Sequence, residues 1–178
     1  MREGKERIAA IMNTRRYAQF LIAPLLLLVS GAMQHQTKIL KVPVGQPADE
    51  RAIQLTLPRA QDPLWLKFAK CKIGYDNRSG LFNIAVTPDV RAIAGHTVTL
   101  SGFVLPLDGS DRTKHFLLTR NTPVCMFCPP GQPNEVVEVL SPHAIDWTDK
   151  LVTVTGPLAL INNGEKGMFF KIDASAVR

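Results

Sequence analysis

The sequence predicts a mainly β fold, a small five-stranded Greek-key barrel of the OB type with a short N-terminal helix and strand extension. Five runs of alternating apolar residues lie between residues 97 and 174. The first run is long and contains Gly102, where a barrel strand must coil. Residues 141–147 start near a proline and predict a short helical link between the third and fourth strands. A β-sandwich is the alternative, because alternation does not distinguish a closed barrel from stacked sheets.

The first 32 residues have the features of a bacterial secretion signal. A positively charged region ends at Arg15 and Arg16, and an apolar run of 13 residues follows at 17–29. Small residues before and at Ala32 suit cleavage there, and the run is shorter than the about 20 residues that cross a bilayer. We expect a signal peptide over residues 1–32 and a periplasmic protein. An uncleaved inner-membrane anchor is the alternative, and it is the one membrane contact that we expect.

The charge of the chain limits the class of partner. The formal charge of the 178 residues is +6, but without the first 32 residues 16 basic and 13 acidic side chains remain, a surplus of +3. A domain that binds nucleic acid normally has a strongly basic surface with exposed aromatic side chains. We therefore expect no nucleic-acid partner.

Residues 33–60 are predicted to be a linker, because prolines and glycine are scattered among polar residues there. The alternating run at 53–57 predicts at most an edge strand. A single domain is expected over residues 61–178. It begins with a short helix, since Asp62 suits the N-cap and Pro63 suits the first helical position.

Strands and turns follow along the rest of the chain. Residues 81–86 predict a strand, and Pro88 predicts the start of a short helix that Gly95 ends. Trp65 and Trp147 are expected in the core or as plugs at a barrel end. The five barrel strands are expected at residues 97–105, 114–120, 135–140, 151–160 and 168–174.

The loop between the second and third predicted strands, residues 121–135, carries the most distinctive chemistry. Cys125 and Cys128 form a single Cys-x-x-Cys motif. A closed zinc site needs four ligands, and His115 on the preceding strand is the best candidate for a third. Copper(I) is the other candidate, because two thiolates beside the thioether of Met126 suit a soft ion.

The same cysteines support a second interpretation. In an oxidising compartment they form a disulfide that clamps the proline-rich loop onto the barrel. Thiol-disulfide catalysis is disfavoured, because Pro129 and Pro130 follow Cys128 where a helix would have to begin to stabilise a thiolate. The metal site and the clamp both stay open at this point. Cys71, the third cysteine, is predicted to be a small buried residue.

Three short motifs carry a resemblance to known proteins. They are Gly102-Phe103-Val104-Leu105-Pro106-Leu107, Phe116-Leu117-Leu118, and Cys125 with Pro129-Pro130 and Pro133-Asn134-Glu135-Val136-Val137. Together they resemble the core signature of a domain-of-unknown-function family of exported bacterial envelope proteins, most clearly from residue 95 to residue 140. Many members have a histidine two residues after the first cysteine, where this chain has Phe127 followed by Cys128. Some members are encoded beside components of ABC transporters that are linked to metal supply.

The sequence thus predicts an exported accessory protein of the cell envelope. In the first hypothesis it binds zinc or copper(I) through Cys125, Cys128 and His115, in support of an envelope ABC transporter or another envelope protein. In the alternative it is a structural or protein-interaction domain with a disulfide-clamped loop. We expect no enzyme, because no catalytic triad, carboxylate pair or phosphate-binding glycine loop stands out in the sequence.

Overall fold

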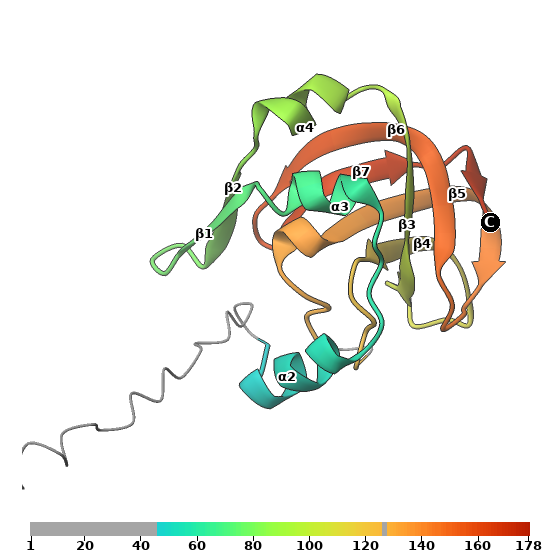
Figure 1. Ribbon diagram of the computed structural model, residues 1–178, viewed down its shortest axis with the longest axis horizontal. Helices are drawn as coiled ribbons and strands as arrows, with labels where there is room; N and C mark the ends of the chain where they lie inside the picture. Colours follow the sequence, from blue (N-terminus) through green and yellow to red (C-terminus); the bar gives the residue numbers. More distant parts are fainter. Residues whose placement is uncertain (1–45, 126–127) are drawn as a thin grey trace, which may run out of the picture. The chain divides into compact units, whose positions relative to one another are not determined.

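The computed structural model describes residues 46–125 and 128–178 (Figure 1). The predicted signal peptide, the first part of the predicted linker, Met126 and Phe127 lie outside the described residues. The helices are α2 (Ala48–Thr56), α3 (Pro63–Phe68), α4 (Pro88–Ile93) and the 3₁₀-helix η1 (Pro133–Glu135). The strands are β1 (Lys72–Asp76), β2 (Leu81–Ala85), β3 (Thr97–Pro106), β4 (Arg112–Thr119), β5 (Val136–Asp146), β6 (Val152–Asn163), β7 (Met168–Asp173) and β8 (Ala176–Val177).

The strands β3 to β7 close into a barrel, so the fold prediction is confirmed. The pairing runs β3–β4–β5–β7–β6, and β6 pairs back with β3. The β5–β7 pair is parallel and the other barrel pairs are antiparallel. Counted along the barrel strands, the order is 1-2-3-5-4-1, a Greek-key arrangement of the OB type. The closing β3–β6 pair excludes the sandwich alternative.

Gly102 is the point at which β3 passes from one neighbour to the other. The residues up to Gly102 pair with β6, and those from Phe103 onward pair with β4. A Cβ atom at position 102 would lie 2.8 Å from Cγ of Leu118 and 2.8 Å from the carbonyl oxygen of Thr119. The strand coils tightly enough here that only hydrogen fits, as the sequence predicts.

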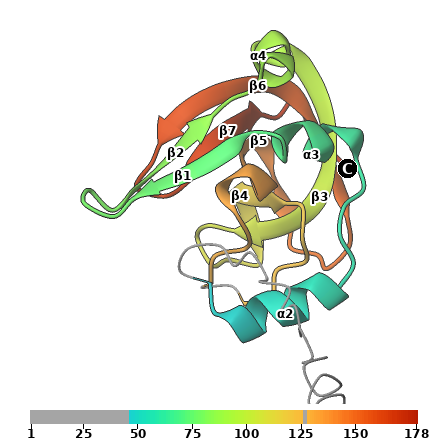
Figure 2. The ribbon, with the colours of Figure 1, turned by 60° about the vertical axis from the view of Figure 1, so that its left-hand side comes forward.

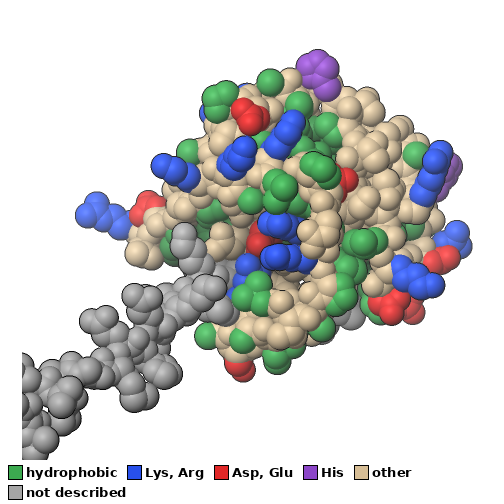
Figure 3. All heavy atoms as spheres, viewed as in Figure 1, with side chains coloured by type: hydrophobic (Ala, Val, Ile, Leu, Met, Phe, Trp, Pro, Cys, Tyr) green, Lys and Arg blue, Asp and Glu red, His purple; other side chains and the backbone are tan. Residues whose placement is uncertain are grey.

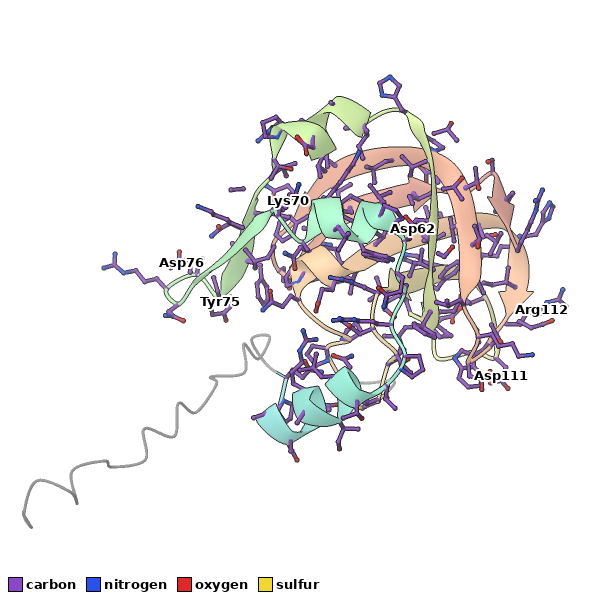
Figure 4. All side chains as sticks on the ribbon, viewed as in Figure 1. Asp62, Lys70, Tyr75, Asp76, Asp111 and Arg112 are labelled. Atoms are coloured by element: carbon purple, nitrogen blue, oxygen red, sulfur yellow. A yellow bond between two sulfur atoms is a disulfide. The ribbon has the colours of Figure 1, made fainter. Side chains whose placement is uncertain are left out.

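Helix α3 covers one end of the barrel core. Its N-terminus forms as predicted, with Oδ1 of Asp62 accepting a hydrogen bond of 3.0 Å from the amide of Leu64 (Figure 4). Trp65 and Phe68 are completely buried, as expected for Trp65. The indole Nε1 of Trp65 donates to the carbonyl oxygen of Ser101 at 2.8 Å, so its one polar atom is satisfied in the core. Cys71 is buried at the end of this segment, as predicted.

Two sheet elements differ from the sequence prediction. Residues 141–147 are not a helical turn, because β5 continues to Asp146 and pairs there with Arg112 of β4. Strand β1 was not predicted, since few of its residues are apolar. It forms by pairing with β2, where the rings of Tyr75 and Phe82 lie 4.9 Å apart. In both cases hydrogen bonds to a neighbouring strand supply the structure that local sequence does not specify.

Helix α2 corrects the edge strand predicted at residues 53–57. The side chains that it buries are polar, Arg51 and Gln54, while Ile53 and Leu55 are exposed. The alternating apolar residues predict a strand that buries its apolar side chains, but the segment is a helix that buries its polar side chains. No helix within residues 46–125 and 128–178 is long and apolar enough to cross a membrane.

We predict that Gly102→Ala lowers the free energy of unfolding by about 1 to 3 kcal/mol, because the added methyl group overpacks the contact with Leu118 and Thr119. Chemical denaturation of the protein measures this loss. Ser101→Ala is the matched control, since it removes one hydrogen bond of 3.0 Å to Thr153 and no core contact. Its cost should be within about 1 kcal/mol. Equal losses in the two variants would contradict the close approach at Gly102.

Candidate functional site

The candidate site is the cysteine loop, defined as residues 121–135 between β4 and β5, of which 121–125 and 128–135 are described. Cys125 and Cys128 lie at disulfide distance, with Cα atoms 5.3 Å apart. That separation is within the normal range for a bridged pair. This finding favours the disulfide clamp over the metal site, and metal binding stays a prediction.

Gln54 of α2 holds both arms of the cysteine loop. Its side-chain Nε2 donates to the carbonyl oxygen of Thr122 at 3.2 Å and to that of Pro130 at 2.9 Å. The two acceptors lie on opposite sides of the disulfide in the chain. Only 2% of Gln54 is exposed, so these hydrogen bonds are shielded from water. The amide of one glutamine therefore fixes the spacing of the two arms.

An ion pair between Arg51 of α2 and Glu135 fixes the far end of the loop. Nη1 and Nη2 of the guanidinium donate to the two carboxylate oxygens at 3.1 and 3.2 Å. The side chains are 9% and 13% exposed. Nη1 of Arg51 also donates to Oε1 of Gln54 at 2.8 Å. This two-point, charge-assisted geometry orients helix and loop as well as attracting them. Figure 2 shows α2 beside the described arms of the loop.

Glu135 also determines the backbone of the second arm. Its Oε2 accepts a hydrogen bond of 2.9 Å from the amide of Gln132, which begins η1 with a capping box. Gly131 has a φ of 148°, and a Cβ atom there would lie 2.7 Å from the same carboxylate oxygen. Glycine is required at this position on both grounds. Asn134 then joins the arm to the core, donating from Nδ2 to the carbonyl oxygen of Cys71 at 3.0 Å.

The structure does not place His115 with the two cysteines. His115 lies on β4, is 45% exposed at the side chain, and shares a hydrogen bond of 2.7 Å with Glu138. The carboxylate near the cysteines is that of Glu50 of α2: one of its oxygens and both cysteine sulfurs all lie within 4.8 Å of one another. No sequence signal identifies Glu50, because the helix that carries it was not predicted.

Several buried polar atoms gather around the same helix and loop. Within the described ranges, the buried side-chain nitrogen and oxygen atoms without a hydrogen-bond partner are Oε1 of Gln46, Oε2 of Glu50, Nε of Arg51, Nε of Arg120 and Nδ2 of Asn121. Each belongs to α2, to the residues before it, to the first residue of the cysteine loop or, for Arg120, to the residue just before that loop. Buried polar atoms are normally paired. Their concentration here marks this region, and not the barrel core, as chemically unusual.

The first arm of the cysteine loop forms one wall of an apolar pocket. The pocket has a volume of about 310 Å³ and is lined by Phe103, Val104, Leu105, Thr122, Pro123, Val124, Cys125, Trp147, Thr148 and Asp149. Trp147 was expected in the core or as a plug at a barrel end; it is outside the core, half exposed at the rim of this pocket. Because β5 continues to Asp146, the tryptophan falls in the connection after the strand. Its amide donates to the carbonyl oxygen of Asp111 at 2.7 Å, which places this pocket at the barrel end that Asp111 and Arg112 mark in Figure 4.

The second arm forms the wall of another apolar pocket of about 290 Å³. Pro129, Pro130, Gly131 and Pro133 line it together with Phe82 and the start of β7. Beneath it, Leu117 belongs to a small cluster with Leu105 and Met168 that is separate from the main core. The cysteine loop thus lies between two apolar pockets, one beside each arm.

We predict that Glu135→Ala lowers the free energy of unfolding by about 3 to 5 kcal/mol, because it leaves Arg51 buried without its counter-charge. Equilibrium denaturation measures the loss. Asp173→Ala is the control, since the Asp173 side chain is 56% exposed and its pair with Lys171 should contribute no more than about 1 kcal/mol. The double variant Arg51→Met/Glu135→Leu should recover part of the loss. Similar losses for Glu135→Ala and Asp173→Ala would show that the buried pair does not hold the loop.

Comparison with known proteins identifies the family of the chain. The family described as "Protein of unknown function (DUF3299)" matches residues 61–169. A crystal structure of a DUF3299 family protein from Pseudomonas aeruginosa PAO1 is similar at 24% sequence identity with a TM-score of 0.44, covering 53% of this chain and 66% of that protein, slightly under two thirds of its length. No curated protein matches the chain. This chain belongs to the DUF3299 family, whose function is unknown.

Proposed function

We propose that the protein is an exported, non-catalytic interaction module of the cell envelope, in which the cysteine loop shapes a binding pocket for an apolar segment of an envelope protein. The observation that carries the proposal is the double restraint on this loop, by the Cys125–Cys128 bridge and by Gln54. A loop held at both arms costs little further ordering when a partner binds. The predicted signal peptide and the disulfide, which persists in oxidising compartments, support the envelope location.

The apolar pocket beside the first arm has the chemistry of a contact site. Its volume of about 310 Å³ suits one or two large apolar side chains. Trp147 stands half-exposed at its rim, and exposed tryptophan is the residue type most enriched among the dominant contacts of protein interfaces. Leu107 and Leu151, on the connections on either side of this end, are also exposed. Each lies two residues along the chain from a residue that lines the pocket, Leu105 and Asp149 respectively.

Charge does not favour a nucleic-acid ligand over a protein. On the face drawn in Figure 3, basic and acidic side chains are interspersed with hydrophobic ones. A mixed surface of this kind suits a protein partner with a polar rim around an apolar centre. An envelope ABC transporter is one partner of this kind, and the family resemblance supports it. Zinc or copper(I) binding at the cysteines is a second candidate function, which the position of Glu50 favours for the reduced protein.

Site-specific photo-crosslinking in the native cell tests the interaction. A photoreactive amino acid in place of Trp147 should give one discrete adduct with an envelope protein. The same probe in place of Leu66, an exposed residue of α3 outside the pocket, should not give it. Cys125→Ser/Cys128→Ser should reduce the adduct at position 147, because the first arm loses the bridge and keeps the hydrogen bond from Gln54.

A second crosslinking experiment tests whether Trp147 itself contacts the partner or only lies near it. With the probe at Leu107, the substitution Trp147→Ala should reduce the adduct at least tenfold, since a central tryptophan commonly contributes 2 kcal/mol or more to an interface. An adduct of equal yield at positions 147 and 66, an adduct with a cytoplasmic protein, or no adduct at position 147 would contradict the proposal.

A further inference from the structure

The position of Glu50 beside the disulfide is unexplained by the interaction function. Glu50, Cys125 and Cys128 are each partly buried, and one ligand atom from each lies within 4.8 Å of the other two. Oε2 of Glu50 is buried, and the described residues give it no hydrogen-bond partner. Carboxylates are rarely buried beside apolar groups and sulfur without a partner, because burial penalises their charge. This carboxylate therefore points to a positively charged ligand.

The fold fixes this carboxylate toward the loop. Glu50 precedes Gln54 by four residues in α2, so the two side chains share one face of the helix. Gln54 bonds Thr122 and Pro130 on both arms of the loop. The adjacent Arg51 is bonded to Glu135 at the loop end. The helix cannot turn Glu50 away from the cysteines without breaking these hydrogen bonds.

We infer that reduction of the Cys125–Cys128 disulfide creates a zinc site whose three protein ligands are Cys125, Cys128 and Glu50. Ligand atoms at about 2.0 to 2.3 Å from a tetrahedral zinc ion lie roughly 3.3 to 3.8 Å from one another, so small side-chain shifts convert the present group into a ligand set. The carboxylate favours zinc over copper(I), which prefers sulfur ligands alone. Three protein ligands leave one tetrahedral position for a further ligand.

The disulfide controls this site by ordinary exchange chemistry. A dithiol reductant attacks the bridge, is itself oxidised to a disulfide, and leaves two protein thiols after transfer of two electrons and two protons. Zn²⁺ then displaces the two thiol protons to solvent and binds both thiolates and the carboxylate. The oxidised protein offers the carboxylate alone. The inference rests on the second candidate function, metal binding at the cysteines, and not on the interaction function, since either function can hold without the other.

Zinc titration of the full chain tests the inference. Protein reduced with a dithiol, and then freed of it under anaerobic conditions, should bind one zinc ion more tightly than micromolar in competition with a chromophoric chelator. The oxidised protein should not. Glu50→Gln should weaken binding by the reduced protein at least tenfold, as loss of a ligand should exceed the 10- to 100-fold effects of outer residues.

Three controls make the result specific. Asp49→Asn, at the exposed neighbouring position, and His115→Ala should both bind zinc like the unaltered protein, because neither side chain belongs to the ligand group. Cobalt in place of zinc should give a sulfur-to-metal charge-transfer band that Cys125→Ser/Cys128→Ser abolishes. Circular dichroism should show that the reduced protein and Glu50→Gln stay folded. Equal binding by oxidised and reduced protein, unchanged binding by Glu50→Gln, or unfolding on reduction would overturn the inference.

Discussion

The buried ion pair between Arg51 and Glu135 is the interaction on which the cysteine loop depends. It joins residues that are 84 positions apart in the chain and so fastens the N-terminal helix to the end of the loop. A pair buried this deeply contributes stability only when its remaining hydrogen bonds are also made. Gln54 and the amide of Gln132 make two of them, whereas Nε of Arg51 has no partner among the described residues. Helix α2, η1 and the described arms of the loop therefore form one cooperative unit.

This unit and the barrel are stabilised by different means. The barrel has an apolar core in which Phe68 stacks on Phe170 with ring centroids 4.2 Å apart, and its strands close on themselves without help from α2. None of the described residues of α2 and of the loop belongs to the two clusters of buried apolar side chains, and directional hydrogen bonds hold these elements together. A rigid scaffold that carries a polar, separately fastened loop is the usual way in which a small barrel positions a binding surface.

The barrel was predictable because its signals are local. Alternation gives the strands, Gly102 marks the change of partner in β3, and Asp62 with Pro63 starts α3. The site was only half predictable. The Cys-x-x-Cys motif identifies Cys125 and Cys128. Helix α2, however, buries arginine and glutamine in place of apolar residues, and no local sequence pattern predicts a helix that packs by polar contacts. The residues that α2 supplies to the site, including Glu50, are positioned by contacts between distant parts of the chain.

The segment that matches the family begins at residue 61, after α2 has ended. The helix that fastens the loop thus lies outside the region by which the family is identified. A fragment cut to those bounds keeps β3 to β6, the disulfide and Glu135, but it ends two residues into β7. It also exposes the carboxylate and the carbonyl groups that α2 covers. A comparison of related proteins over the matched segment alone would not show whether each of them has such a helix. The salt bridge that fastens the loop has its first partner, Arg51, upstream of the boundary set by sequence similarity.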